Sequence, residues 1–175
     1  MTCDICTVLK ATSLGAMLIL AGCAGTPPEP PPLPPVPKID RVAIVRGGAE
    51  ASTESVELIP LQNPAVEYLR AESTRLEAQR KFPAAAQKID QALGIEPNNP
   101  QLMQLKAEAL LRAEKFLDAE KMAMKSYEVG QHIGRWCTRN WLVIAESRAA
   151  QGDTTTAASA RKRAAGCPVG PLIKY

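Results

Sequence analysis

Residues 80–100, with the sequence RKFPAAAQKIDQALGIEPNNP, decide the fold of this 175-residue chain. Their opening, RKFPAA, returns 34 residues later as EKFLDA at positions 114–119, and Leu76 matches Leu110 at the same offset. Apolar residues lie at helical spacing between short turns, and Pro83 falls in a first helical turn, where its missing N–H costs nothing. A fixed offset with this pattern predicts a repeated helical hairpin.

This unit resembles the tetratricopeptide repeat. The resemblance rests on an aromatic residue at the turn between the two helices, small residues where helices cross, and a closing proline: Phe82, Ala85, Ala92 and Pro97. The second unit keeps the aromatic and the small residues, Phe116, Ala107 and Ala119, but has Gln131 in place of the proline.

A third unit begins 38 residues after the second, with the corresponding positions on Trp141, Ala145, Gly152, Asp153, Ala157 and Ala164. We expect its four additional residues to be absorbed near Gly130 to Gly134. The resemblance implies an all-α fold of about three tetratricopeptide-like hairpins in a short solenoid. The expected helices lie near 64–79, 83–94, 99–113, 117–129, 136–151 and 154–165. The expected core joins neighbouring units through Phe82, Ile89, Leu93, Leu110, Phe116, Met122, Trp141 and Ile144.

The segment before the repeats is rich in proline. Eight prolines lie between positions 27 and 37, a density that favours extended polyproline II structure and excludes helix. We expect residues 23–63 to form a disordered, proline-rich tether. Two short apolar runs, at 42–45 and 56–61, are left unassigned, because they could form strands or dock on the domain.

The first 22 residues have the parts of an export signal: a short region ending at Lys10, an apolar run from Ala11 to Ala21, and small residues before Cys23. Leu20-Ala21-Gly22-Cys23 reads as a bacterial lipoprotein cleavage box, which implies lipid on Cys23. An ordinary signal peptide cut near Ala24 is the alternative. Ala24, rather than Asp, follows the cysteine, which by resemblance implies the outer membrane, facing the periplasm. The expected organisation is therefore signal 1–22, tether 23–63, repeat domain 64–167 and tail 168–175.

Two cysteines remain once Cys3 and Cys6 leave with the signal and Cys23 is lipidated. A pair in an oxidising compartment is a disulfide candidate. Cys137 stands at the start of the third unit's first helix and Cys167 just after its second, and an antiparallel hairpin brings these ends together. We predict a disulfide that staples the last hairpin. Two unrelated buried thiols, or a metal site that includes His132, are the alternatives.

The residues carry no catalytic pattern. His132 lies in an expected loop without a nucleophile beside it, and the helix carboxylates have the spacing of solvated faces. The chain carries a net charge of +3, with seven basic and two acidic residues from position 129 onward. Such a basic end suits an acidic partner or an anionic surface, and equally a solvated helix face. We expect no enzyme, no cofactor, no metal site, no small-molecule substrate and no nucleic acid.

Binding is the class of function that the repeat implies, because stacked hairpins form a groove lined by the first helix of each pair. The groove positions, carried over from the repeat pattern, are Arg70, Thr74, Glu77, Gln104, Glu108, Arg112, Arg139 and Glu146. Their mixed charge suits a polar peptide or a loop of a partner. The same residues could equally be solvated surface.

Lipid signal, proline-rich tether and small repeat domain together resemble the periplasmic lipoproteins that activate bifunctional, class A penicillin-binding proteins. The resemblance implies that the tether carries the domain to an inner-membrane peptidoglycan synthase and favours its active state. The alternative is assembly: a pilotin for an outer-membrane secretin, or a scaffold between envelope proteins. Pilotins of this fold generally carry more repeats and no long tether.

Overall fold

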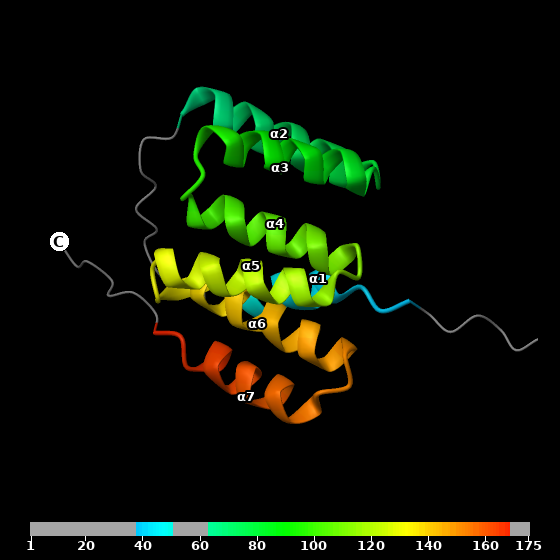
Figure 1. Cartoon of the computed structure of the whole chain (residues 1–175), viewed down its shortest axis with the longest axis vertical. Coiled ribbons are helices and arrows are strands. Elements are labelled where there is room, and N and C mark those ends of the chain that lie inside the picture. The colour runs from blue at the N-terminus through cyan, green and yellow to red at the C-terminus, as the bar shows by residue number, and fades with distance from the viewer. Residues whose placement is uncertain (1–37, 51–62, 169–175) are drawn as a thin grey trace, which may run out of the picture. The chain divides into compact units, whose positions relative to one another are not determined.

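The computed structural model describes residues 38–50 and 63–168, and this part of the chain folds into seven helices without a strand. The helices are α1 (Arg41–Glu50), α2 (Pro64–Ala78), α3 (Phe82–Ile95), α4 (Pro100–Arg112), α5 (Phe116–Val129), α6 (Gly134–Ala150) and α7 (Thr154–Ala165). Figure 1 shows α2 to α7 as three hairpins stacked in chain order. The all-α class is confirmed, and the six helices predicted from the repeat are correct to within two residues at each end.

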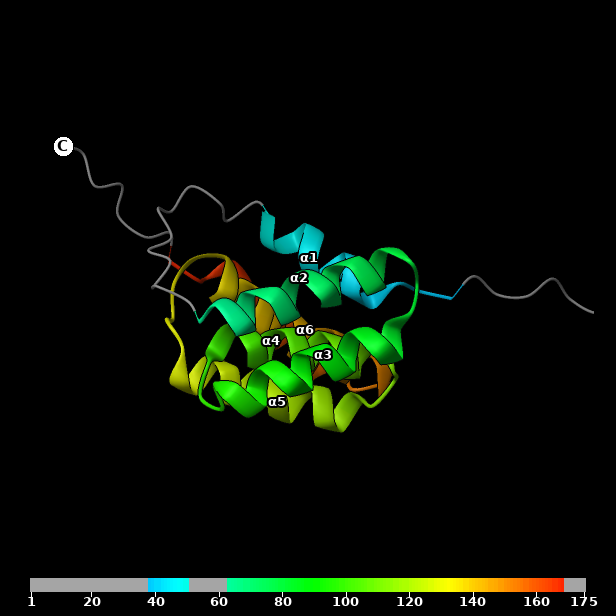
Figure 2. The ribbon, with the colours of Figure 1, turned by 90° about the horizontal axis from the view of Figure 1, so that it is seen from above.

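The three hairpins form two layers. Their first helices, α2, α4 and α6, lie toward α1, and Figure 2 shows α3 and α5 on the side away from it. Within the described residues, α1 packs against α6 and α4. The predicted signal, Cys23, the proline block, the run at 56–61 and residues 169–175 lie outside the described residues.

Local sequence starts and ends the helices. Asn63 and Asn99 each precede a proline, and their side chains accept hydrogen bonds from the first backbone N–H groups of α2 and α4. Each hairpin turn then has the same residue position in the left-handed region, with φ of 59° at Arg80, 60° at Glu114 and 81° at Gly152. In all three turns the backbone makes the paired hydrogen bonds of a Schellman motif.

Glycine is the favoured residue at this turn position, and only the third turn has it. We expect Gly152→Ala to lower the free energy of unfolding by about 1 kcal/mol, because a Cβ meets no neighbour there and the cost is that of the left-handed backbone alone. Arg80→Gly should raise it by about 0.5 kcal/mol, since the same strain is removed but the unfolded chain gains freedom. Urea denaturation measures both changes. Shifts of the same sign would contradict the left-handed backbone conformation at these two turn positions.

The four additional residues of the third unit form the first turn of α6, which begins at Gly134 rather than at the predicted position 136. The loops 96–99 and 130–133 have equal length, whereas α4 has 13 residues and α6 has 17. A helical turn takes 3.6 residues, so four more residues add one turn at the start of α6 and leave Trp141 and Ala145 facing the core as before. Cys137 lies in this extra turn.

The apolar core is divided in two. A small cluster joins α2, α3 and α4 through Val66, Ala92 and Leu102, with Leu69 and Leu93 against it. A larger one joins α1, α4, α5, α6 and α7, and Leu110, Phe116 and Met122 pack against its fully buried members. Ile89, Trp141 and Ile144 are buried as predicted, and Phe82 is half-buried beneath the guanidinium of Arg112.

Residues 41–50 correct the predicted boundary of the tether, because they form α1 and belong to the domain. Val42 and Val45 belong to the larger core, and Ala49 is buried as well, with at most 2% of each residue exposed. The carboxylate of Asp40 accepts a hydrogen bond from the Ala43 N–H and caps the helix. The sequence did not predict this helix, because it contains two adjacent glycines, Gly47 and Gly48, and glycine is a poor helix former. Burial of one apolar face overrides that propensity.

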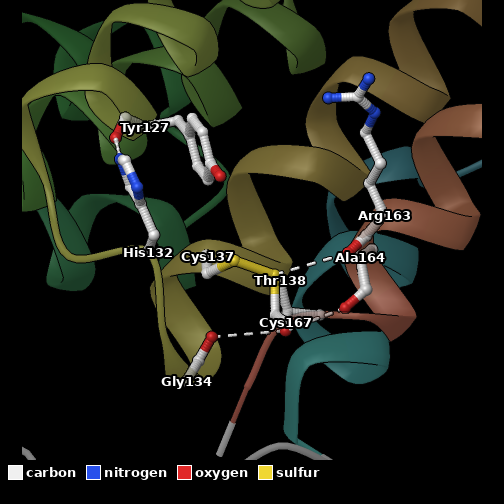
Figure 3. The surroundings of a disulfide bond; sticks show 8 residues. All are labelled: Tyr127, His132, Gly134, Cys137, Thr138, Arg163, Ala164 and Cys167. Carbon is white, nitrogen blue, oxygen red and sulfur yellow. Dashed lines mark hydrogen bonds between the residues drawn. A yellow bond between two sulfur atoms is a disulfide. The ribbon is translucent and has the colours of Figure 1, made fainter.

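The predicted disulfide is present between Cys137 and Cys167, whose Cα atoms lie 5.9 Å apart (Figure 3). Beside it, the N–H of Gly134 donates to the carbonyl of Pro168 at 2.8 Å. The hydroxyl of Thr138 lies 3.3 Å from the Gly134 carbonyl and 3.5 Å from that of Ala164. These contacts close the end of the last hairpin, whose helix α7 buries only alanine side chains.

Candidate partner-binding groove

The eight predicted groove residues all lie on the first helices of the hairpins: three on α2, three on α4 and two on α6. The structure brings their charged groups into ion pairs rather than leaving them in solvent. Gln104, Glu108 and Glu146 are buried, with at most 3% of each residue exposed. What covers this side of α4 and α6 is α1.

Arg46 of α1 joins two hairpins. Its guanidinium makes two hydrogen bonds to the carboxylate of Glu77 on α2, at 2.8 and 3.2 Å, and its Nε donates to Glu108 on α4 at 2.8 Å. Burial works to lower the pKa of Arg46, but the hydrogen bond to Glu77 and the charge of Glu108 outweigh it, and the pKa is raised. Arg46 therefore stays charged and holds α1 against both hairpins.

Glu108 lies at the centre of the ion-pair network. Besides Arg46, its carboxylate accepts hydrogen bonds from the Nε of Arg139 on α6 at 2.7 Å and from the amide of Gln104 at 3.1 Å. Its side chain is 1% exposed. A buried carboxylate with this many donors is fully paired, so its charge is tolerated inside the fold.

The other end of α1 is held in a similar way. Arg41 donates to Glu146 at 2.9 Å, and Glu146 also accepts from Arg161 of α7 at 2.9 Å. Asp40 lies 3.7 Å from Arg112, whose guanidinium covers the ring of Phe82 at 4.3 Å. Sequence reasoning missed Arg41 and Arg46. The signal that could have found them was the i, i+3, i+7 spacing of Val42, Val45 and Ala49, in the same short segment as the two arginines.

Part of the groove remains open. The backbones of α2 and α4 do not approach each other closely, and a cleft of about 490 Å³ lies between them. Four of the eight predicted groove residues, Arg70, Thr74, Glu77 and Arg139, line it, and Ile89 of α3 lies among its lining residues. Thr74 donates to the Arg70 carbonyl, and Arg70 pairs with Glu67 at 2.9 Å.

The extra turn of α6 supplies another wall of this cleft. Arg135 and Trp136 lie in that turn and line the cleft. The guanidinium carbons of Arg135 and Arg139 lie 5.3 and 4.7 Å from the centre of the Trp136 ring. A cleft that combines an apolar floor with arginine, glutamate and one aromatic side chain suits a peptide segment with polar groups.

Among the described residues, no three His, Cys, Asp or Glu side chains gather as a metal site requires. His132 stacks on the ring of Tyr127, with ring centres 4.1 Å apart, and its Nε2 lies 2.8 Å from the Tyr127 carbonyl. No helix in residues 38–50 or 63–168 has both the length and the apolar character to cross a bilayer.

No protein-family description and no curated protein matches this chain in sequence. Among solved structures, the globular C-terminal domain of P. aeruginosa LpoP is similar, with a TM-score of 0.56 and 24% sequence identity. The match covers 59% of this chain and 98% of that domain. The chain therefore shares the helical fold of the LpoP C-terminal domain, built here from three tetratricopeptide-like hairpins.

Proposed function

We propose that this protein is a non-catalytic envelope lipoprotein that binds a class A penicillin-binding protein and raises its activity. The fold shared with the LpoP C-terminal domain is the observation that carries the proposal. The lipoprotein cleavage box at Cys23 supports a membrane anchor, and the proline block after it supports an extended spacer that lets the domain reach a partner across the periplasm. In this proposal Cys23 is lipidated, the anchor lies in the outer membrane, and the domain faces the periplasm.

The mechanism is a shift in the population of the synthase's states. A protein without catalytic groups changes a partner's rate only by binding its active state more tightly than its inactive state. A tenfold difference in affinity corresponds to about 1.4 kcal/mol, which an interface of modest size supplies. The open cleft beside α2 is the surface that we assign to this contact.

The test is a polymerisation assay with the class A penicillin-binding proteins of the same cell. The purified chain without its lipid should raise the rate of glycan polymerisation. Thr74→Trp, which fills the cleft from an exposed position on α2, should lose most of this effect. Lys125→Trp is the matched control, because it adds the same bulk at an exposed position of α5 outside the cleft, and it should activate normally.

Unchanged rates with every such synthase would reject activation and leave the pilotin or scaffold assignment. Activation that survives Thr74→Trp would reject the cleft as the contact surface while keeping the function.

A further inference from the structure

Three carboxylates form an acidic row on the side of the hairpins that α1 covers. Glu77, Glu108 and Glu146 come from α2, α4 and α6, and each pairs with an arginine of α1. A basic occupant fits this groove best, because it takes the place of the α1 arginines beside these carboxylates, whereas an acidic one would bring like charges together.

The chemistry of α1 defines what the groove accepts. Two arginines five positions apart flank Val42 and Val45, and with Ala49 these side chains form one narrow apolar stripe. At Gly48 a Cβ would lie 2.8 Å from Leu142 of α6, so small residues let the two helices approach. This is the helix-in-groove mode of recognition, with a short basic helix as the ligand.

The buried carboxylates that pair with α1 have other partners on the hairpins. Without Arg46, Glu108 keeps Arg139 and Gln104; without Arg41, Glu146 keeps Arg161. The side chain of Glu77 is 23% exposed and returns to water. The departure of α1 therefore leaves no buried carboxylate without a partner.

α1 is also a weak helix on its own. Ten residues are too few for a stable isolated helix, and each of Gly47 and Gly48 lowers helix formation about fivefold relative to alanine. Its stability therefore comes from docking, and we expect it to open before the hairpins unfold.

We propose that the groove is a receptor for a short basic helix of a partner protein, and that α1 is the resident ligand which this helix displaces. Displacement of α1 by a basic helix does not depend on the proposed function. Only the identification of the partner as the synthase rests on it. Binding of the partner helix then releases α1 from the groove. Because α1 directly follows the N-terminal segment, partner binding changes how that segment is attached to the domain.

The first experiment uses the peptide of residues 38–50, KIDRVAIVRGGAE, with a fluorescent label, and the full chain without its lipid. Val45→Asp in the chain places a charge at a fully buried position and undocks α1. The peptide should bind this variant at least about tenfold more tightly than wild type. In wild type, α1 is joined to α2 by residues 51–62 and competes at an effective concentration on the order of millimolar.

Matched peptides and a second chain variant sharpen this test. The Arg46→Glu peptide should lose at least about tenfold in affinity, whereas Ile44→Ser, at an exposed position, should bind within about twofold. Gly47→Ala in the chain, where a Cβ meets nothing, should strengthen the resident helix and weaken trans binding by about fivefold. The proposal would be overturned if the peptide bound wild type and the Val45→Asp chain equally. It would also be overturned if the Arg46→Glu peptide bound as tightly as the unsubstituted peptide.

Hydrogen exchange on the wild-type chain decides the matter even if Val45→Asp does not fold. The amides of α1 should exchange faster than those of α4 and α6. Equal exchange rates in all three helices would show that α1 is a permanent part of the fold and would overturn the proposal. A wild-type dimer in which α1 of one copy occupies the groove of the other would also overturn the proposal, because a second copy would then be the occupant.

Adding the synthase separates this inference from the proposed function. Release of α1 protection on binding, with tighter binding by Val45→Asp and weaker binding by Gly47→Ala, supports displacement. Activation with α1 still protected would overturn displacement and leave the function standing. If the peptide binds as expected but the chain has no effect on any synthase, the proposed function is rejected, and the groove remains a receptor for a basic helix of another partner.

Discussion

Replacing Cys137 and Cys167 together by alanine is expected to lower the free energy of unfolding by about 3 to 4 kcal/mol. The bridge closes a loop across a sequence separation of 30 residues, and in the chain-entropy account a loop of this size restricts the unfolded state by that amount. The melting temperature should fall by about 10 °C in a domain of this length. Thermal and urea denaturation of the oxidised chain measure both quantities.

The physical reason for so large an effect is the weakness of the last hairpin. Helix α7 buries only Ala157, Ala160 and Ala164, and no further hairpin covers its outer side in the described residues. Reduction of the wild-type chain should reproduce the loss, and the double variant should not respond to reductant. Two free thiols in the unreduced, unfolded chain would contradict the bridge, and an unchanged melting temperature would contradict its role.

Glu108→Gln is expected to lower the free energy of unfolding by about 3 kcal/mol. Its carboxylate is the common acceptor of Arg46, Arg139 and Gln104, and an amide in its place turns an N–H group toward one of these donors. Breaking a buried ion pair costs about 3 to 5 kcal/mol. We expect the lower end because the side chain of Arg46 is 37% exposed and can turn its charge to solvent.

The matched control for this variant is Glu72→Gln. Glu72 pairs with Arg75 on the surface of α2, in an i, i+3 arrangement, and such exposed pairs contribute little. Its removal should leave the urea midpoint unchanged. A loss at Glu108 no greater than at Glu72 would mean that the arginines gain nothing from the buried carboxylate.

The hairpins were predictable because their determinants are local. The 34-residue offset and the Asn-Pro pairs at the starts of α2 and α4 specify the first two units, and small residues such as Ala85 mark the helix crossings. The pairing of Cys137 with Cys167 followed from the same pattern, since an antiparallel hairpin brings its two ends together.

The site could be predicted only in part. The repeat pattern placed Glu77, Glu108 and Arg139 on the first helices of the hairpins, but it carried no information on what lies against those helices. Helix α1 comes from a segment whose adjacent glycines oppose helix formation, and its partners are 31 to 105 residues away in sequence. The extra turn of α6 was missed for a different reason, because an insertion of four residues reads alike in a loop or a helix.

The sequence by itself determined the hairpins, their order and their turns, since each depends on residues within one or two helical turns of one another. Only the tertiary structure decided that residues 41–50 form a helix, that this helix fills the groove over α4 and α6, and that Glu108 is buried among arginines. These features depend on burial and on charge pairing across distant segments. Their free energy exists only once the hairpins have stacked, and no short stretch of sequence encodes it.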